Sequence, residues 1–340
     1  MAPPPARSLA WSHGTVTVET LGGMLGPTLF VLPDGRQIAP FHIAPWFDGD
    51  EAGDQPGVLQ RLRGEWPCVP FGVSSDRPAK DGWPASIAAG QVDRNPHGYG
   101  SNHHWEWLDD ARDALALSID YPADHPISRL ERWVTPVPGR PALDFHLKVH
   151  VRADCTLPIG LHPTFCLPDA PGTVQLDITA SAAATFPGVV DASSIFSPGQ
   201  IFTDWHKVPV AAGGTLNPSR LPLQHQTEEL LQLLEAGGKA SLRNHSENYQ
   251  VTLKWNSIHF PDLLLWISNR GRRHAPWNGR HLALGVEPVC SAFDLGCEIS
   301  AKPNPINKKG TPTAHAFRAG EVFETRYRIS VAPLDAPQVR

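Results

Sequence analysis

Proline is the feature of this sequence that most limits what the chain can fold into. The chain of 340 residues contains 35 prolines, about twice the average usage. Proline has no backbone N–H group, so it gathers in turns, at strand starts and along sheet edges. Because these prolines are spread along the chain among Gly, Asp and Asn, they predict many short strands joined by turns.

Alternation of apolar and polar residues supports this prediction. Between residues 143 and 151 every second side chain is apolar, which is typical of a strand with one buried face. The same alternation predicts strands at 115–119, 174–178, 251–255 and 323–329.

One segment instead fits a helix. Thr227 is a suitable N-cap, Glu228 and Glu229 suit a first helical turn, and an apolar stripe follows at Leu230, Leu231 and Leu234. Gly237 and Gly238 would end this helix.

The chain shows neither a fixed-period repeat nor a linker that divides it. Hydrophobic residues make up 41% of the sequence, enough for a large core, and all-β sandwiches of this length often stay undivided. We therefore expect an all-β protein with one domain at 15–332, an N-terminal tail at 1–14 and a C-terminal tail at 333–340.

Charge and apolar patterning exclude several partners. The formal net charge is −5 without a long basic run, which argues against nucleic acid because that partner needs a concentrated positive surface. The sequence has no apolar window approaching the roughly 18 residues of a membrane span, and no signal-peptide pattern. Five scattered cysteines are expected to be reduced, and we expect a cytoplasmic protein. The oligomeric state is not predicted.

The strand predicted at 281–288 carries a candidate catalytic carboxylate. Leu282, Leu284 and Val286 share one face, and Ala283, Gly285 and Glu287 share the other. The two small residues leave the sheet surface open in front of Glu287, as a ligand cleft requires. The alternative is that Glu287 forms an ion pair with a nearby arginine.

Two histidine-containing segments are candidates for ligand contact. His97, His103 and His104 lie in HGYGSNHHW, whose glycines allow a close backbone approach, and His162 lies in GLHPTF. A single histidine is more often a satisfied polar residue than a catalyst. A metal site formed by these four histidines is a further alternative, although neighbouring residues on a strand point to opposite faces.

Two long segments, 63–107 and 269–280, lack strand patterns, and tryptophans lie in or beside both. Their tryptophans either pack against the core or stack on the C–H face of a sugar ring. The members concerned are Trp66, Trp83, Trp105, Trp107, Trp266 and Trp277. The sequence has no phosphate-binding Walker loop, GxSxG, HExxH or GxGxxG motif, so nucleotide chemistry and serine hydrolysis are not expected.

Four segments in order resemble the aldose 1-epimerase family, the galactose-mutarotase-like proteins. They are RGEWPCVPFG (63–72), HGYGSNHHW (97–105), GLHPTF (160–165) and GVEPV (285–289). The bacterial branch that includes hexose-6-phosphate mutarotases is the most similar, and the resemblance spans roughly 15–330. Each motif alone is weak, whereas four in this order are fairly specific. The resemblance implies a large antiparallel β-supersandwich.

The resemblance also implies residue roles in sugar ring opening. Glu287 would be the general base at the anomeric hydroxyl, His162 the general acid at the ring oxygen, and His97 would assist. Arg63 would hold sugar hydroxyls, and no cofactor or metal is required.

Further sugar contacts are expected at His104, Trp105 and Trp277. Asp204 in FTDWH would take the place of the family's sugar-binding aspartate, for which the sequence has no clear equivalent. Arg270, Arg272 and Arg273 either meet a phosphorylated or acidic sugar or form a solvated hairpin tip. The alternative function is a non-catalytic carbohydrate-binding protein with the same fold.

Overall fold

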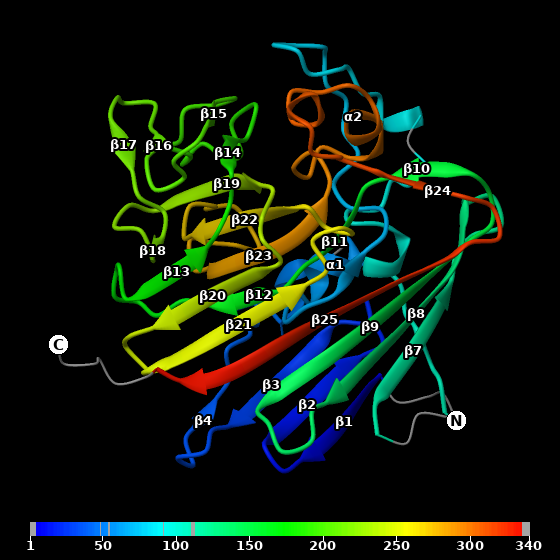
Figure 1. Ribbon diagram of the computed structural model, residues 1–340, viewed down its shortest axis with the longest axis vertical. Helices are drawn as coiled ribbons and strands as arrows, with labels where there is room; N and C mark the ends of the chain where they lie inside the picture. Colours follow the sequence, from blue (N-terminus) through cyan, green and yellow to red (C-terminus); the bar gives the residue numbers. More distant parts are fainter. Residues whose placement is uncertain (1–4, 48, 54, 91, 110–112, 335–340) are drawn as a thin grey trace.

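The computed structural model describes residues 5–47, 49–53, 55–90, 92–109 and 113–334. Within these residues the only α-helices are α1 (Gly57–Gln60) and α2 (Cys297–Ala301), and three-residue 3₁₀ turns occur at Asp50–Ala52, Ala88–Gly90, Tyr99–Ser101 and Asn307–Lys309. The remaining regular structure is β-strand (Figure 1), which confirms the all-β prediction. None of the helices in the described part of the chain is long and apolar enough to span a membrane.

The larger of two main sheets is antiparallel and has nine strands. Their spatial order is β18 (Arg220–Leu221), β13 (Val174–Ile178), β20 (Lys239–Asn244), β21 (Tyr249–Trp255), β25 (Val322–Pro333), β9 (Ala142–Val151), β8 (Ile127–Pro136), β7 (Leu115–Asp120) and β6 (Glu106–Trp107). The five strands predicted from alternation all lie in this sheet, as parts of β9, β7, β13, β21 and β25.

The second main sheet has eight strands. Seven follow the order β15 (Ile201–Phe202), β14 (Ala182–Thr185), β19 (Thr227–Leu234), β22 (Asp262–Asn269), β23 (Leu282–Cys290), β11 (Ile159–Leu161) and β5 (Pro67–Cys68). The eighth, β12 (Thr164–Cys166), also pairs with β23. β23 lies where a strand was predicted at 281–288.

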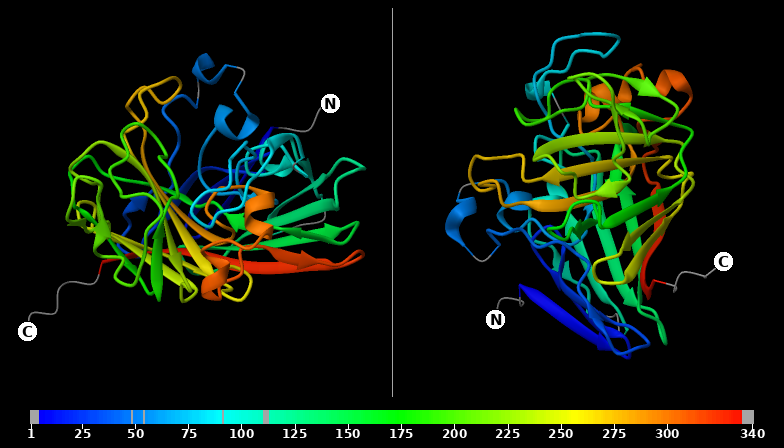
Figure 2. Two further views of the ribbon diagram at one scale, coloured as in Figure 1. Left: turned by 90° about the horizontal axis from the view of Figure 1, so that it is seen from above. Right: turned by 90° about the vertical axis from the view of Figure 1, so that its left-hand side faces the viewer.

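Smaller sheets complete the molecule. One comprises β1 (Ala6–Trp11), β2 (Gly14–Glu19), β3 (Leu25–Val31) and β4 (Gln37–Ile38), and lies at the lower end of Figure 1 and of the right-hand view of Figure 2. The others pair β10 (Cys155–Leu157) with β24 (His315–Phe317), and β16 (Val208–Pro209) with β17 (Thr215–Leu216). Because β1 pairs with β2 along its whole length, residues 6–11 are not the tail expected at 1–14. The tail expected at 333–340 falls largely outside the described residues.

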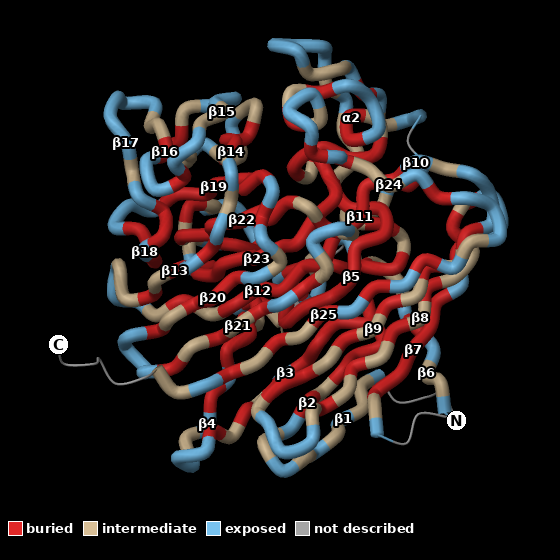
Figure 3. The backbone as a smooth tube through the Cα atoms, viewed as in Figure 1, coloured by how far each residue is buried: buried red, intermediate tan, exposed pale blue. Residues whose placement is uncertain are grey.

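The main core lies between the inner faces of the two large sheets. Leu143, Phe145 and Leu147 of β9 belong to the same buried cluster as Leu265 of β22 and Leu284 of β23. The central strands β19, β22 and β23 are buried at every position (Figure 3), so their outer faces are covered as well. A second buried cluster, which includes Leu230, Leu264 and Trp266, occupies that outer side.

The helix predicted at 227–234 is the strand β19, and the prediction was wrong. Adjacent leucines place apolar side chains on both faces of this buried strand, and such a pattern cannot be told from a buried helix by its period. Leu231 and Leu233 enter the inner core, whereas Leu230 and Leu234 enter the outer cluster. In each pair of neighbouring leucines, one side chain therefore packs on the inner face of the sheet and the other on its outer face.

A buried ion pair joins the nine-stranded sheet to the segment that follows Arg63. Arg132 of β8 donates to the carboxylate of Glu65 and, over 2.7 Å, to the carbonyl oxygen of Gly23. The other Glu65 oxygen accepts a hydrogen bond from the Tyr327 hydroxyl of β25. Arg132 is 1% exposed and Glu65 is fully buried, so each charge depends on its partner.

We expect Arg132→Met to lower the free energy of unfolding by about 3 kcal/mol, because it leaves Glu65 as an uncompensated buried carboxyl. Urea denaturation followed by circular dichroism measures this loss. The matched control is Arg129→Met on the same strand, where the partly exposed side chain pairs with Asp120 and Glu131, and where the expected loss is less than about 1 kcal/mol. Equal losses in the two variants would contradict a special role for the buried pair.

Candidate active site

A cavity of about 230 Å³ opens on the outer face of the eight-stranded sheet. Its floor includes Leu264 of β22, which lies opposite Glu287 of β23 in the strand pairing. Segments from both long loops form its walls. The lining residues are Val58, Leu59, Leu62, Trp66, Val73, Pro96, His97, His162, Leu230, Leu264, Trp266, Arg272, Trp277, Glu287 and Asp294.

A larger depression of about 480 Å³ lies over the nine-stranded sheet, against Asp144, His146, Lys254, Arg326 and Arg328 among others. The acidic residue of this depression, Asp144, is already paired, because it accepts two hydrogen bonds from Arg328 over 2.5 and 2.7 Å. The smaller cavity is the better candidate because it gathers buried titratable groups that have no such partners.

Glu287 and His162 meet inside the smaller cavity. The Glu287 Oε1 atom lies 3.4 Å from His162 Nε2. The imidazole stacks on the indole of Trp66, with ring centroids 4.1 Å apart, and its Nδ1 atom lies 3.2 Å from Thr164 Oγ1. The backbone N–H of His162 donates to the carbonyl oxygen of Trp66, so the two rings come from paired segments. His162 is thereby held with Nε2 towards the carboxyl group.

Burial governs the proton affinity of these groups. Burial, followed by the nearby charge of Asp294, raises the pKa of Glu287 well above its ordinary value. Burial, followed by the proximity of His97, holds the pKa of His162 well below its usual range. Burial also lowers the pKa of His97 to about 4. The pair therefore favours one shared proton over two separate charges.

Gly285 provides space for the Glu287 side chain. A Cβ atom at position 285 would lie 2.2 Å from Glu287 Oε1 and 3.0 Å from the Cβ of Trp266. The small residue predicted to open a cleft thus serves first to let the carboxyl group fold back over its own strand. Ala283 is fully buried on the same face.

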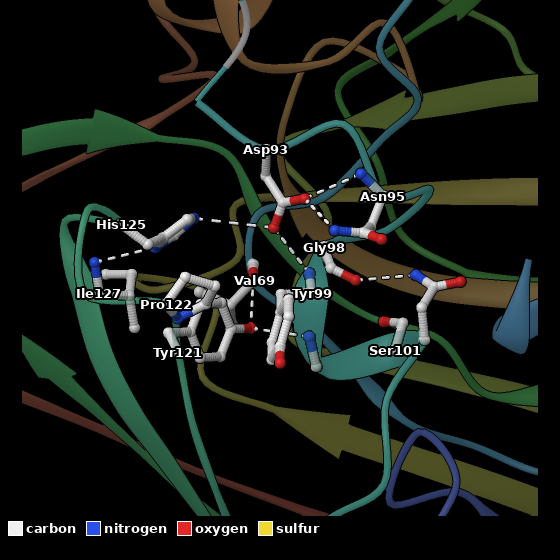
Figure 4. Close-up of polar contacts among 12 residues, drawn as sticks. Val69, Asp93, Asn95, Gly98, Tyr99, Ser101, Tyr121, Pro122, His125 and Ile127 are labelled. Carbon is white, nitrogen blue, oxygen red and sulfur yellow. Dashed lines mark hydrogen bonds and ion pairs between the residues drawn. The ribbon is translucent and has the colours of Figure 1, made fainter.

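The His97 segment is held in a constrained turn by Asp93. Asp93 Oδ1 accepts two hydrogen bonds from Asn95, from the backbone N–H and the side-chain amide, each 2.8 Å long. Its Oδ2 atom accepts the backbone N–H of Tyr99 over 2.6 Å (Figure 4). His97 itself has a φ of 57°, a left-handed conformation that is uncommon outside glycine. Such strain is characteristic of functional sites.

Four lining residues carry a buried polar atom that has no hydrogen-bond partner among the described residues. The atoms are Trp66 Nε1, His97 Nδ1, Glu287 Oε1 and Asp294 Oδ1. Buried polar groups are normally paired, and each unpaired one costs about 1–3 kcal/mol. Their grouping around one cavity indicates a polar ligand that has several donors and acceptors.

Four of the eight residues predicted from the sequence line this cavity: Glu287, His162, His97 and Trp277. Arg63 does not. It is fully buried and pairs with Glu19, with its guanidinium 4.5 Å from the ring centroid of Phe47. Trp105 also lies elsewhere, within the inner core, where its Nε1 donates to the carbonyl oxygen of Gly100.

His104 and Asp204 lie outside the cavity as well. His104 is exposed, and its Nδ1 atom lies 2.9 Å from Thr20 Oγ1. Asp204 is exposed and forms an ion pair of 3.1 Å with Lys207. These residues were predicted to lie at the site because they are close in the sequence to family motifs or resemble them. Closeness in the sequence does not determine where a side chain points.

The positions of the side chains exclude the alternative of a metal site formed by four histidines. His103 stacks on Tyr99, and His104 faces Thr20, so neither joins His97 and His162. Over the residues that the structure describes, no group of three or more His, Cys, Asp or Glu side chains is arranged to hold a metal ion.

The basic loop contributes one arginine to the cavity. Arg272 lines it and pairs with Glu228, with 3.2 Å between Arg272 Nε and Glu228 Oε1. The guanidinium lies 4.5 Å from the ring centroid of Trp277. Arg270 pairs with Asp169 and Arg273 donates to Gln226, in both cases at exposed positions. These two arginines accord with a solvated loop.

Sequence reasoning missed Asp294 and the apolar wall formed by Val58, Leu59 and Leu62. Nothing in the sequence distinguishes these apolar residues from ordinary core. Asp294 follows Glu287 closely in the chain, and that is the only signal that could have suggested it. Trp66 and Trp266 were recognised as tryptophans open to ligand contact, and both line the cavity.

Solved structures with the same fold include proteins described as mutarotase-like or as aldose epimerase homologues. No protein-family model and no curated protein sequence matches the chain. An aldose epimerase homologue from C. elegans aligns with 97% of this chain and 99% of its own, with a TM-score of 0.63 and 16% identity. A galactose mutarotase-like protein from Lactobacillus casei aligns over 96% and 99%, with a TM-score of 0.59 and 16% identity. A Synechocystis protein aligns over 97% and 96%, with a TM-score of 0.65 and 14% identity.

The fold is therefore that of the galactose-mutarotase-like proteins, as the sequence resemblance implied. At these identities the comparison establishes the fold and not the activity.

We expect Gly285→Ala to impair the site more than the fold, because the new methyl group would overlap the Glu287 carboxyl and displace it from His162. The expected result is a loss of the activity of the site of about tenfold or more, the cost of misplacing a catalytic group. The matched control is Gly237→Ala, where the nearest atom to a new Cβ is 3.8 Å away. Full function in Gly285→Ala would show that the space at Gly285 is dispensable.

We expect Glu287→Gln to stabilise the fold by an amount that grows with pH. The unfolded Glu287 loses its proton near pH 4.3, whereas the folded group keeps it to a higher pH. Its contribution to stability is therefore complete below pH 4.3 and is lost as the pH rises, by up to about 1.4 kcal/mol per pH unit. Urea unfolding of both proteins from pH 5 to 8 measures the difference, in which the contributions of histidines that do not contact Glu287 cancel. A difference that stays constant over this range would contradict the raised pKa.

Proposed function

We propose that the cavity binds an uncharged aldose and interconverts its α and β anomers, the reaction of an aldose 1-epimerase. The observation that carries this proposal is the contact of Glu287 with His162 inside a cavity that also holds unpaired polar atoms. Ring opening needs one group that accepts a proton and another that donates one on the same substrate. A carboxylate and an imidazole suit these roles near neutral pH.

The cavity walls support a sugar as the ligand. The indoles of Trp66, Trp266 and Trp277 line it and offer flat surfaces on which the C–H face of a pyranose packs. The four unpaired polar atoms offer hydrogen bonds to hydroxyl groups, each of which both donates and accepts. A purely apolar ligand would leave those atoms unpaired.

The proposed mechanism moves one proton at each end of the anomeric centre. Glu287 removes the proton of the anomeric hydroxyl while His162 protonates the ring oxygen, so that the bond between C1 and this oxygen breaks and an open-chain aldehyde forms. Rotation about the C1–C2 bond presents the other face of the carbonyl. Both protons then return in reverse, and the ring closes as the other anomer. His97, whose ring centroid lies 5.1 Å from that of His162, would bind the same region of the substrate.

The proton of the pair has to move from Glu287 to His162 before this cycle begins. Burial favours the state in which the proton resides on Glu287 and both groups are neutral. Sugar hydroxyls that donate to Glu287 favour its carboxylate form, which shifts the proton to His162. Because each turnover returns the pair to its starting state, no further acid or base is needed.

The charges around the cavity support an uncharged sugar rather than a phosphorylated one. Among the described residues that line the cavity, Arg272 is the only arginine or lysine. Its guanidinium already pairs with Glu228. Glu287 and Asp294 add two carboxyl groups to the lining. A phosphate group with nearly two negative charges would meet this acidic lining without an unpaired cation, so the proposal does not extend to the hexose-6-phosphate branch.

We expect the wild-type protein to accelerate the change in optical rotation of fresh α-D-glucose or α-D-galactose, and Glu287→Gln to lower kcat by about 10²–10⁴-fold. Sugar binding, followed by tryptophan fluorescence, should persist in this variant because the amide keeps the shape of the carboxyl. Glu324→Gln, an exposed change on β25, serves as the matched control. If the wild type merely matches buffer while sugars still bind, the chain is a carbohydrate-binding protein and the proposed turnover fails.

A further inference from the structure

A second carboxyl group faces the same cavity and has no place in the proton transfers described above. Asp294 lines the cavity, and its Oδ1 atom is buried without a hydrogen-bond partner among the described residues. Its backbone carbonyl accepts the N–H of Val73 over 2.7 Å, so the residue is anchored to the wall of the cavity. An unpaired carboxyl oxygen in this position is costly to the empty protein.

Strained backbone directs Asp294 towards the cavity. The preceding residue, Phe293, is fully buried and has a φ of 47°. A bulky residue in this left-handed region costs about 1–3 kcal/mol and persists only where its surroundings impose it. The Phe293 N–H donates to Gln232 Oε1 over 2.6 Å, and the Phe293 carbonyl oxygen accepts the Ser291 hydroxyl over 2.6 Å. Both backbone polar groups of the strained residue are thus fixed.

The residue that holds Phe293 is itself held from two sides. The side-chain amide of Gln232 donates to Asp262 Oδ2 and to the carbonyl oxygen of Ser291, over 2.8 Å in each case. Gln232 and Asp262 belong to the central strands β19 and β22. The fold therefore anchors the turn at Phe293 to its most buried strands, and the side chain that this turn presents to the cavity is Asp294.

Opposing influences act on the Asp294 carboxyl group. Burial raises its pKa, while the charges of Arg77 and Arg272 lower it. Asp294 in turn raises the pKa of Glu287, which accords with two carboxyl groups that share one cavity.

We propose that Asp294 is a second substrate-binding carboxyl group, which accepts a hydrogen bond from a sugar hydroxyl away from the anomeric centre and so determines which sugar is used. This inference rests on the proposed function. A site built to bind a particular hydroxyl discriminates strongly against a sugar that lacks it, because the buried group of the protein is then left unpaired.

The test is Asp294→Asn, assayed by polarimetry on glucose, galactose, mannose and their single-position deoxy derivatives. We expect KM for the preferred sugar to rise by about tenfold or more, because a hydrogen bond to a charged group is lost. We expect kcat to change by less than about threefold. Discrimination between the preferred sugar and one particular epimer or deoxy derivative should collapse. Asp294→Ser covers the case in which the asparagine amide makes a new hydrogen bond.

Asp204→Asn is the matched control, since that aspartate is exposed and pairs with Lys207. It should leave KM, kcat and sugar preference unchanged. Circular dichroism and the melting temperature verify that each variant folds. Unchanged KM and preference in both Asp294 variants would overturn the proposal, and so would an equal loss on every sugar, because a merely structural role predicts that pattern.

Fluorescence titration of the lining tryptophans separates this inference from the proposed function. If the wild type binds sugars without turning them over, the proposed catalysis fails, and the dissociation constants of the Asp294 variants still decide the role of Asp294. If wild-type turnover is present and Asp294→Asn retains its preference, the inference about Asp294 fails alone. If no sugar of the panel binds or reacts, both fail.

Discussion

The buried pair between Arg132 and Glu65 is the interaction on which the candidate site depends. It lies on the inner side of the nine-stranded sheet, yet Glu65 is adjacent to Trp66, the ring on which His162 stacks. Backbone bonds from His162 to Trp66, and from Thr164 to Gly64, extend the connection to β12. One ion pair thus connects the sheet without the cavity to the imidazole of the sheet that carries it. A buried pair of this kind adds little stability by itself, and here it joins two layers.

The site assembles groups whose individual placement is unfavourable. His97 and Phe293 adopt left-handed backbone conformations, and four buried polar atoms at the cavity have no hydrogen-bond partner among the described residues. Glu287 and Asp294 are carboxyl groups in surroundings that oppose ionisation. The large core between the sheets offsets these costs, because burial of apolar surface is the dominant favourable term in folding. Instability concentrated at one cavity is the pattern expected of a functional site.

The sequence predicted those parts of the structure that depend on local patterns. Strand β9 was predictable because one of its faces is partly exposed to solvent. Strand β23 was predictable because its small residues alternate with larger apolar ones. Strand β19 was not, since burial on both faces removes the alternation. Glu287, His162 and His97 were found through motifs, whereas Asp294 depends on a strained turn held by Gln232, some 60 residues away in the chain. Arg63 failed for a similar reason, because its Glu19 partner lies in a separate sheet.

The complete burial of β19, β22 and β23 has a consequence for how such a site can change. These strands form the floor of the cavity and are shielded on both faces, so their hydrogen bonds open only with large-scale unfolding. The walls come from loops, which tolerate substitution and move more easily. Glu287 therefore lies on the rigid floor, whereas His97 and Arg272 lie on segments outside these strands. A lineage with this architecture can alter the walls of the cavity while the floor keeps Glu287 in place.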